Sequence, residues 1–353
     1  MPGDEKKEFG DYQTPPEFCL SICEYMKNNM NHSPKAILEP TCGVGNFLSA
    51  ASSTFSGIDV FGIDINQDYV WRARKAVPNA TIAVGNIFGL DTRRICKEND
   101  VLIIGNPPWA TNSNLSFNLP QKINFKGLRG IEALTGSSNF DICEYIILQL
   151  LEQYKNTNSI VCMICKMSVA RNIILEMSRK HIAHQKIELL LFDCNKVFGI
   201  SAAAGVLVIQ LSSCAMKKNE IVCEIKNFET RELSDVLTVT DGTLKSIHAK
   251  SELEGTCQLK WRQGIKHDCG KVMELELCGG TYVNKLKEAV SVEDSLVFPL
   301  VKSSHFKKPI IRDFSKYVLV TQTKPKQDTF YIQSDFPLTW DYLTRHSEYF
   351  SKR

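Results

Sequence analysis

The chain reads Asp100-Val101-Leu102-Ile103-Ile104-Gly105-Asn106-Pro107-Pro108-Trp109 near the end of its first third. The short apolar run 101–104 is bounded by turn residues, a pattern that predicts a buried parallel strand. Pro107 confines Asn106 to an extended backbone, and the fixed φ of the two prolines stiffens the turn. We therefore expect a buried strand that ends in a rigid turn, with the flat face of Trp109 beside it.

This turn has two hydrogen-bond acceptors next to each other in the sequence. The side-chain oxygen of Asn106 and the main-chain carbonyl of Pro107 both accept, and the prolines have no backbone N–H. Two acceptors beside an aromatic plate suit a planar substrate with an NH2 group, such as an exocyclic base amine or a primary amide. The structural alternative is a proline-rich strand exit with a core tryptophan, and the rest of the chain decides between the two.

Polar residues also end the neighbouring apolar runs. The runs 36–38, 60–63 and 80–84 end at Glu39, at Asp64 and at Gly85-Asn86. Helix-like segments alternate with these runs, which predicts an α/β fold with a doubly wound, mostly parallel sheet of the Rossmann-like type. Ligands bind outside the carboxyl ends of the strands in such sheets, so we expect these polar residues to line a site there.

Further segments extend the α/β pattern. A helix is predicted to begin at Thr14-Pro15-Pro16-Glu17, with Thr14 as N-cap, Pro15 at N1 and Glu17 at N3 of a capping box. Helices are predicted over 140–154 and 169–183, strands over 160–165, 187–192 and 202–211, and a hairpin with an Asp-Gly turn over 236–242. The stretch 110–139 is long and weakly periodic, which is typical of a lid or a binding loop.

A composition shift at Lys217-Lys218-Asn219-Glu220 marks the predicted domain boundary. We expect a larger α/β domain over residues 1–215. A smaller domain of mixed secondary structure is expected over residues 216–353.

The composition is that of a globular protein, because 353 residues with 43% hydrophobic content are enough for a substantial core. No run approaches the roughly 20 apolar residues of a membrane span, and the first residues lack the apolar region of a signal peptide. We therefore expect a cytoplasmic protein that does not enter a membrane. The net charge of +3 is too small by itself to indicate a nucleic-acid partner.

The 13 cysteines are scattered, mostly through apolar or helical stretches. Only Cys162-Met163-Ile164-Cys165 has the C-x-x-C spacing. It lies in a predicted strand, where neighbouring side chains face opposite ways, and no second Cys or His pair stands nearby. Reduced core thiols are therefore expected, and no metal site.

The turn after the first predicted strand reads Glu39-Pro40-Thr41-Cys42-Gly43-Val44-Gly45-Asn46-Phe47. Glycines at a strand-to-helix turn let backbone N–H groups approach a ligand closely, and an acid such as Asp64 after the next strand can bind ribose hydroxyls. A nicotinamide site would read G-x-G-x-x-G, whereas Leu48 stands three positions after Gly45. The acid at Glu39 suits an ammonium group instead, which favours S-adenosylmethionine.

The ordered set of motifs resembles the adenine-N6 DNA methyltransferases of restriction–modification systems, in their γ arrangement, over residues 10–211. The family's cofactor motifs match Gln13, Thr14 and Pro15; Glu39, Pro40, Thr41, Cys42, Gly43, Gly45 and Asn46; Asp64 and Ile65; and Asn86 and Ile87; a further one is expected at 139–142. The catalytic motif N-P-P-[YFW] matches Asn106, Pro107, Pro108 and Trp109, and the segment 197–200 resembles the motif with a second aromatic, here Phe198. Asn86 stands where the family usually has Asp, so a neutral acceptor replaces a charged one at the cofactor's adenine amine.

The resemblance implies S-adenosylmethionine as cofactor, double-stranded DNA as substrate and a cognate restriction endonuclease as a partner. It implies that the target adenine is flipped out of the duplex and stacks on Trp109, with Phe198 as the candidate for the other face of the base. The Asn106 side-chain oxygen and the Pro107 carbonyl would accept the two amine protons while the nitrogen attacks the methyl group. Asn106 is also expected to contact the cofactor.

The resemblance places sequence recognition in the second half of the chain. Residues 261–269 and 298–305 resemble segments that follow the catalytic domain in bacterial relatives, and the stretch 302–326 has seven Lys or Arg residues and one acid. Arg262, Lys302, Lys307 and Lys308 are the candidates for DNA contacts, with a solvated surface as the alternative for each. Relatives continue past the region that matches 341–353, so we expect a shortened recognition region.

Two other functions stay open from the sequence. N-P-P-[YFW] also occurs in enzymes that methylate an RNA base or a protein glutamine, since the same acceptors suit any planar NH2. The Gln13-Thr14-Pro15 motif and the large C-terminal extension favour DNA. The third hypothesis is a non-catalytic DNA-binding remnant, which the neutral Asn86 and the position of the chain's end suggest.

Overall fold

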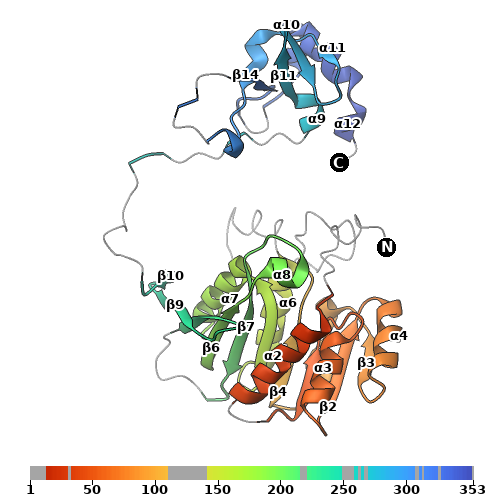
Figure 1. Cartoon of the computed structure of the whole chain (residues 1–353), viewed down its shortest axis with the longest axis vertical. Helices are drawn as coiled ribbons and strands as arrows, with labels where there is room; N and C mark the ends of the chain where they lie inside the picture. The colour runs from red at the N-terminus through yellow and green to blue at the C-terminus, as the bar shows by residue number, and fades with distance from the viewer. Residues whose placement is uncertain are drawn as a thin grey trace. The chain divides into compact units, whose positions relative to one another are not determined.

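The computed structural model describes residues 13–30, 33–109, 141–214, 221–248, 258–260, 264–265, 269–306, 310–311, 314–324 and 327–351. The chain forms two compact units, residues 1–255 and 256–353, and each is described by itself (Figure 1). The predicted loop at 110–139 lies outside the described residues.

One sheet forms the centre of the first unit. Within the described residues its strand order is β10-β9-β8-β6-β7-β5-β4-β1-β2-β3. The strands are β1 (Ala36–Glu39), β2 (Asp59–Asp64), β3 (Thr81–Val84), β4 (Val101–Gly105), β5 (Ile160–Lys166), β6 (His184–Leu191), β7 (Ala204–Leu211), β8 (Val222–Asn227), β9 (Leu233–Thr240) and β10 (Thr243–Ser246). From β3 to β5 in this order all neighbours are parallel, whereas β7 runs antiparallel to both β5 and β6. The predicted doubly wound, mostly parallel α/β sheet is confirmed.

Helices pack against this sheet. They are α2 (Pro16–Asn29), α3 (Asn46–Thr54), α4 (Gln67–Ala76), α6 (Ile142–Tyr154), α7 (Met167–Arg179) and α8 (Cys194–Phe198). α2 packs beside α3, and α6 beside α7 (Figure 1). Strands β1, β4 and β7 are buried along their whole length, because both faces of the sheet are covered, and this is why their sequences are mostly apolar. The elements predicted over 140–211 agree with α6, β5, α7, β6 and β7 to within a few residues at each end.

The predicted hairpin is also present. β9 and β10 pair antiparallel, with Thr240 opposite Thr243. Asp241 and Gly242 join them with φ values of 51° and 69°. Positive φ at both central residues is the type I′ geometry that matches the twist of the flanking strands, and it explains the Asp-Gly sequence.

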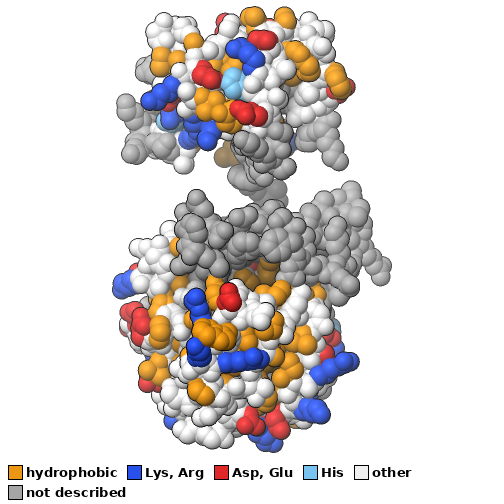
Figure 2. Space-filling model, turned by 90° about the vertical axis from the view of Figure 1, so that its right-hand side faces the viewer, with side chains coloured by type: hydrophobic (Ala, Val, Ile, Leu, Met, Phe, Trp, Pro, Cys, Tyr) orange, Lys and Arg blue, Asp and Glu red, His pale blue; other side chains and the backbone are white. Residues whose placement is uncertain are grey.

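One edge of the sheet is protected by basic side chains. Figure 2 faces the α4 side of the first unit and shows apolar and basic side chains interspersed on this surface. Arg74 of α4 donates two hydrogen bonds to the Ile82 carbonyl of the edge strand β3, at 2.9 and 2.6 Å. Trp71 is 58% exposed, and the Lys75 ammonium lies 3.6 Å from its ring centroid. The charges discourage another strand from pairing with β3.

The domain boundary differs from the one expected at residue 215. Strand β8 pairs parallel with β6, with Ile187 opposite Cys223 and Leu189 opposite Ile225, so residues 222–246 extend the first sheet. The two compact units divide at residue 255. The charged run 217–220, which lies outside the described residues, precedes a further strand of the same sheet, and this is why a local composition shift misplaces the boundary.

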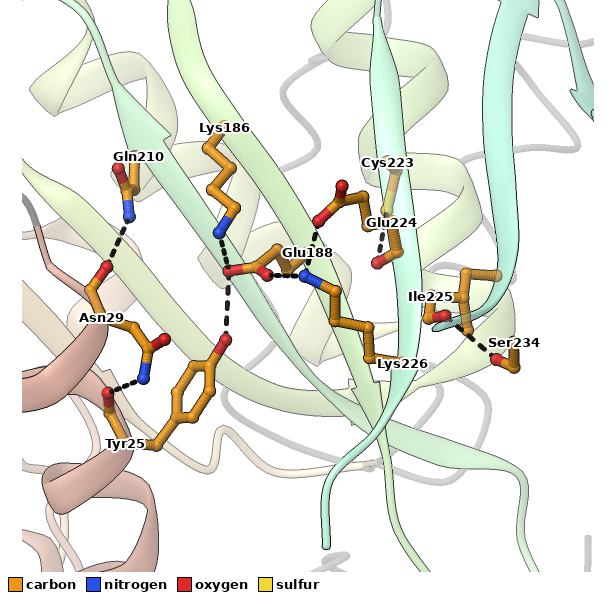
Figure 3. Close-up of polar contacts among 10 residues, drawn as sticks. All are labelled: Tyr25, Asn29, Lys186, Glu188, Gln210, Cys223, Glu224, Ile225, Lys226 and Ser234. Atoms are coloured by element: carbon orange, nitrogen blue, oxygen red, sulfur yellow. Dashed lines mark hydrogen bonds and ion pairs between the residues drawn. The ribbon is translucent and has the colours of Figure 1, made fainter. Parts of the chain in front are cut away.

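A buried ion cluster reinforces this pairing of β6 with β8. Glu188 of β6 is 1% exposed and accepts hydrogen bonds from the Lys226 ammonium at 2.7 Å and from the Tyr25 hydroxyl at 3.2 Å (Figure 3). The Lys186 ammonium lies 3.0 Å from the same carboxylate, and Lys226 also reaches Glu224 at 2.6 Å. The cluster therefore joins three elements, namely α2, β6 and β8.

The start of the first helix also differs from the prediction. α2 begins at Pro16 with Pro15 as N-cap, and no side chain caps it, so the capping box centred on Thr14 is wrong. Thr14 is 5% exposed, and its carbonyl accepts a hydrogen bond from the Asn46 side chain at 2.8 Å. A tertiary contact with the turn before α3 thus takes the place of local capping.

The second unit has a smaller antiparallel sheet of order β13-β12-β11-β15-β14 in its described part. Its elements are α9 (Gly270–Met273), β11 (Glu274–Cys278), β12 (Thr281–Asn284), β13 (Ala289–Val290), β14 (Val297–Pro299), β15 (Lys316–Leu319), α10 (Tyr331–Asp335), α11 (Pro337–Arg345) and α12 (Glu348–Ser351). Its core includes Val272, Leu275, Leu319 and Tyr342. The predicted smaller C-terminal domain of mixed structure is present, although it begins later in the chain. Across the described residues of both units, no helix is long and apolar enough to cross a membrane.

Candidate active site

The carboxyl ends of β4, β1 and β2 lie side by side in the first unit. β1 is the middle strand of the three, with Leu38 opposite Ile103 of β4 and Glu39 opposite Gly62 of β2. A Cβ atom on Gly105 would lie 3.4 Å from Cγ of Glu39. The Glu39 side chain therefore packs against the end of the strand that leads into the Asn106 turn, as the sequence predicted for polar residues at these strand ends.

The turn after β1 requires glycine at two positions. Gly43 and Gly45 have φ values of 51° and 90°, in the left-handed region that side chains disfavour. A Cβ on Gly43 would lie 2.5 Å from Oε1 of Gln13, and a Cβ on Gly45 would lie 2.9 Å from Cβ of Ala73. The two glycines thus allow a close approach of neighbouring chain segments that no other residue would permit.

The predicted N-terminal motif lies over this turn. The Val44 backbone N–H donates to Oε1 of Gln13 at 3.3 Å, and the Asn46 side chain donates to the Thr14 carbonyl at 2.8 Å. Residues separated by about thirty positions are therefore held together, and Pro15 follows directly as the N-cap of α2. The structure brings together Gln13, Thr14, Gly43, Gly45 and Asn46, all of which the sequence predicted.

Asp64, at the end of β2, holds the same turn from the other side. One carboxylate oxygen accepts from the Gly43 N–H and the other from the Asn66 N–H, each at 2.8 Å. The neighbouring Ile65 side chain is 53% exposed, which is unusual for a large apolar side chain next to a sheet. Asp64 is thus fixed by two backbone groups at the position expected of a ribose-binding acid, beside an apolar surface.

Glu39 is a buried carboxyl group with no cationic partner among the described residues. Its side chain is 3% exposed, and its Oε2 and the neighbouring Thr41 Oγ1 are buried without a hydrogen-bond partner among the described residues. Burial raises the pKa of Glu39 well above its usual range, the nearby Asp64 charge adds to this, and a hydrogen bond from the Leu48 backbone opposes it. A bound cation would reverse this situation, because it would supply the missing charge partner.

Cys42, beside Glu39, is a buried thiol. It is 3% exposed, and burial together with the charges of Glu39 and Asp64 raises the pKa of its thiol. The side chain is therefore a neutral packing group, since the thiolate is the reactive form of cysteine.

A short 3-10 helix, Ile87–Gly89, follows β3 at the same edge of the sheet. The Asn86 side-chain oxygen accepts from the Phe88 N–H at 3.1 Å and so caps this helix. Asn86 is exposed and Ile87 is buried. The family that the sequence resembles usually has Asp at this position. Here the neutral Asn86 amide caps the short 3-10 helix.

Trp109 lies against the predicted second aromatic. It is 8% exposed, and its ring centroid is 5.8 Å from that of Phe198 at an interplanar angle of 65°. Phe198 in turn contacts Phe192 at 6.0 Å, and Phe192 contacts Phe18 of α2 at 4.8 Å. The two predicted stacking residues are therefore brought together, but in direct edge contact rather than as two plates with a gap between them.

The helix that carries Phe198 borders open space on one side. A cavity of about 270 Å³ is lined by Leu191, Phe192, Asp193, Lys196, Asn227 and Glu229. α8 is only five residues long, and it ends at Gly199 with a φ of 69°. The segment that holds Phe198 against Trp109 is consequently short and incompletely enclosed.

The ion pair between Lys166, at the end of β5, and Asp141 was not predicted from the sequence. The Lys166 ammonium lies 3.0 Å from Asp141, and Asp141 also caps α6 by accepting from the Cys143 N–H at 3.0 Å. Asp141 belongs to the predicted motif at 139–142, of which 139 and 140 lie outside the described residues. Lys166 has no motif of its own, so only the fold reveals this partner.

Of the predicted DNA-contacting residues, Lys302 is described and Arg262, Lys307 and Lys308 are not. The Lys302 ammonium donates to both oxygens of Glu274, at 2.8 and 2.6 Å. Lys285 also reaches Glu274, at 2.7 Å. Two lysines thus share one carboxylate, and the group keeps one net positive charge.

The residues at the strand ends fit S-adenosylmethionine. The unpartnered oxygen of Glu39 and the Thr41 hydroxyl suit the ammonium group of its amino-acid part, Asp64 suits ribose hydroxyls, and the exposed Ile65 suits an apolar ring. No three His, Cys, Asp or Glu side chains in the described part of the chain come together as a metal site.

Comparison with known proteins identifies sequence relatives. The chain is 34% identical to the type II methyltransferase M.NspV of a Nostoc species over 369 aligned positions, which cover 99% of the chain and 75% of that protein. It is 32% identical over 107 positions to the type II methyltransferase M.CvrRI of Paramecium bursaria Chlorella virus XZ-6E, covering 30% of the chain and 26% of that protein. The methyltransferase subunit of a type I restriction–modification system from Streptococcus thermophilus is 14% identical, with a TM-score of 0.43 over 61% of this chain and 47% of that one. No protein-family model matches the chain.

The fold and the chemistry of the strand ends agree with these relatives on one class, the S-adenosylmethionine-dependent methyltransferases. The similarity to M.NspV extends over nearly the whole chain, across both units. The chain therefore belongs to the type II methyltransferases of restriction–modification systems.

Proposed function

We propose that the protein transfers a methyl group from S-adenosylmethionine to N6 of an adenine that is flipped out of double-stranded DNA. The observation that carries this proposal is the packing of the Glu39 side chain, one carboxyl oxygen of which has no hydrogen-bond partner among the described residues, against Gly105, one residue before the Asn106 turn. A cation-binding group and a turn with two acceptors thus stand next to each other, as methyl transfer between two bound molecules requires.

When bound, the cofactor supplies a methyl group on a positively charged sulfur. The protein's task on this side is to hold and orient it. Glu39 and Thr41 bind the ammonium end, Asp64 binds the ribose, and Ile65, Asn86 and Ile87 surround the adenine. Gln13, Thr14 and Pro15 keep the glycine turn closed over the site through the contacts to Val44 and Asn46. Pro40 and Cys42 shape and pack the turn.

The turn after β4 activates the substrate amine. The N6 lone pair is delocalised into the purine ring, which makes the amine a poor nucleophile. The Asn106 side-chain oxygen and the Pro107 carbonyl would accept hydrogen bonds from its two N–H groups, favour a pyramidal nitrogen and stabilise the positive charge that develops on it during attack. The N–CH3 bond would form as the S–CH3 bond breaks, S-adenosylhomocysteine would leave, and the methylated amine would then lose one proton to solvent. Pro108 keeps the backbone of the turn rigid.

Trp109 stacks on the flipped base. Stacking on an aromatic side chain contributes about 1–3 kcal/mol per base and offsets part of the cost of unstacking. Because Phe198 contacts Trp109 edge to face at 5.8 Å, it must move before it can cover the other side of the base. The short helix α8, which carries Phe198 near its C-terminal end, is the segment that would shift in this movement.

The second unit would read the DNA sequence. Lys302, with Arg262, Lys307 and Lys308, is proposed to contact phosphates or bases. A restriction endonuclease with the same recognition sequence is the proposed functional partner. Both proposals follow from membership of the family.

The deciding experiment offers the purified protein S-adenosylmethionine with a labelled methyl group and four substrates: duplex DNA, tRNA, rRNA and a release factor. We expect label in duplex DNA alone and in N6-methyladenine after digestion. Single-molecule mapping of methylated bases in DNA from expressing cells then identifies the site. Label in RNA or in a glutamine with none in DNA would overturn the proposal, as would the absence of cofactor binding.

A further inference from the structure

The loop that carries Asn86 and Ile87 is held from one side by helix α6. This loop runs from Asn86 through the 3-10 helix Ile87–Gly89 to a second short 3-10 helix, Thr92–Arg94. Two glutamines of α6, Gln149 and Gln153, stand one helical turn apart and point the same way. Neither belongs to a motif that the sequence analysis recognised.

Gln149 uses both of its amide hydrogens on this loop. Its Nε2 donates to the Ile87 carbonyl at 2.8 Å and to the Leu90 carbonyl at 3.0 Å. Both acceptors are carbonyls, so the orientation of the amide is unambiguous. Gln149 is 7% exposed, and buried hydrogen bonds of this kind are costly to remove because their acceptors lose access to water.

Gln153 holds the end of the same loop. Its Nε2 donates to the Leu90 carbonyl at 2.9 Å, and its Oε1 accepts from the Thr92 N–H at 3.0 Å and from the Thr92 hydroxyl at 2.5 Å. Thr92 is fully buried. The two glutamines therefore determine where both ends of the 87–92 segment lie relative to α6.

A ring contact extends this support toward Asn86. Tyr145, one turn before Gln149 on α6, contacts Phe88 edge to face at a centroid distance of 5.5 Å. The Phe88 N–H in turn donates to the Asn86 side chain. The position of Asn86 and of the Ile87 backbone thus depends on α6 through two side chains, Tyr145 and Gln149.

We propose that Gln149 is a positioning residue that gives the cofactor site its selectivity for an adenine base. This inference rests on the proposed function. Asn86 is neutral and its oxygen already caps the Phe88 N–H, so charge contributes little to recognition of the adenine amine. Discrimination then depends on the placement of the Asn86 and Ile87 polar groups, and Gln149 sets that placement through the Ile87 carbonyl.

The test compares two ligands by isothermal titration calorimetry: S-adenosylhomocysteine and S-inosylhomocysteine, in which an oxo group replaces the adenine amine. Gln149→Met keeps the length of the side chain and removes both donated hydrogen bonds. We expect the affinity for S-adenosylhomocysteine to fall about tenfold, as the loss of one to two hydrogen bonds implies. The preference for the adenosyl ligand over the inosyl ligand should fall by at least about threefold, because a displaced loop distinguishes the two less well.

Two further variants separate positioning from general destabilisation. Gln153→Met, which acts on Leu90 and Thr92, should reduce the affinity with a smaller change in preference, and it serves as the second probe if Gln149→Met does not fold. Gln210→Met is the matched control, since Gln210 is a buried glutamine of β7 whose amide donates to Asn29 at 3.5 Å, away from this loop. It should leave both affinities unchanged.

The outcomes are distinguishable. Equal weakening of both ligands by Gln149→Met, or an unchanged affinity, would overturn the positioning role while leaving the proposed function intact. If the unchanged protein binds neither ligand, the proposed function fails and this inference fails with it. A KM for S-adenosylmethionine that rises in Gln149→Met while the KM for DNA stays constant would support the proposal independently.

Discussion

Glu39 and Glu188 are two carboxyl groups on the same sheet, and both are almost fully buried. Glu188 has the Lys186 and Lys226 ammonium groups and the Tyr25 hydroxyl around it (Figure 3). Burial alone would raise the pKa of Glu188, but the hydrogen bonds and charges of the two lysines outweigh it, so its pKa is lowered. At Glu39 burial dominates and the pKa is raised.

The two carboxyl groups differ in whether charged partners are already present in the free protein. A buried carboxylate with two cations holds strands together in the free protein. Glu39 lies at a strand end, and it has one carboxyl oxygen without a hydrogen-bond partner and no cation among the described residues. It therefore does not stabilise the free protein in this way and is suited to a cationic ligand. Glu188 in the middle of β6 therefore stabilises the fold, whereas Glu39 at the end of β1 is proposed to bind the cofactor.

The largest effect is expected at the turn next to Glu39. Asn106→Ala removes one of the two acceptors for the amine protons, so kcat should fall by about 10²–10³-fold, the range for loss of one group that stabilises transition-state charge. Binding of S-adenosylhomocysteine, measured by calorimetry, should stay nearly constant. Substantial residual methylation would show that the acceptor turn is not catalytic and that Glu39 alone defines the site.

Glu39→Gln tests whether the Glu39 carboxylate binds the ammonium group of the cofactor. Loss of a charged partner for the ammonium group should weaken S-adenosylhomocysteine binding by about 10–100-fold, corresponding to a charge-assisted hydrogen bond. The free energy of unfolding of the free protein should stay the same or rise, because an amide is buried in its neutral form without the proton uptake that the raised pKa of Glu39 requires. A clearly destabilised variant would place Glu39 in the same class as Glu188.

Glu188→Gln is the counterpart. It leaves Lys186 without its charge partner, whereas Lys226 keeps Glu224. The free energy of unfolding should fall by about 2 kcal/mol, since both lysines can still reach water. The lowered pKa of Glu188 implies a contribution to stability that is present above the usual Glu pKa and is lost as the pH falls through the lowered value. Urea unfolding at several pH values checks both points, and cofactor-ligand affinity should be unaffected.

The raised pKa of Glu39 predicts a pH dependence of ligand binding. Because the folded free protein retains this proton above the usual Glu pKa, an ammonium ligand that requires the carboxylate must displace it. The affinity for S-adenosylhomocysteine should therefore increase with pH up to the raised pKa, with a proton released on binding. Calorimetry in two buffers of different ionisation enthalpy measures that proton, and Glu39→Gln should abolish it. Proton uptake would contradict the assignment.

The smallest effect is expected in the second unit, where Lys285 and Lys302 share Glu274. Both pairs are partly exposed, so Lys302→Gln and Lys285→Gln should each change stability by less than about 1 kcal/mol. If Lys302 contacts a phosphate, its loss should reduce the slope of log affinity for DNA against log salt by about 1, with Lys285→Gln as the matched control. Equal slopes for both variants would assign Lys302 to Glu274 alone.

The strand ends could be predicted from the sequence because their signals are local. An apolar run followed by Glu39, Asp64 or Asn106 can be recognised without knowledge of the fold. The order of the parallel strands then brings the ends of the three strands together. The glycine turn can also be recognised from the sequence, since its two left-handed positions require glycine.

Features that depend on distant pairing could not be predicted in this way. The boundary at 255 follows from β8 joining β6, and the role of Thr14 follows from its contact with Asn46. Gln149 is one of several polar residues in helix α6, and only the fold places its amide against the Ile87 carbonyl. Lys166 likewise acquires Asp141 through the packing of α6 on β5.

The edge contact between Trp109 and Phe198 has a consequence for which molecules can compete with DNA. Free adenine or adenosine would have to separate the two rings with stacking energy alone, about 1–3 kcal/mol, and without the phosphate contacts of a nucleic acid. Such small molecules should therefore be weak inhibitors. If Trp109 and Phe198 form the proposed base pocket, their contact would therefore select against free nucleosides, which lack the further contacts of a nucleic acid.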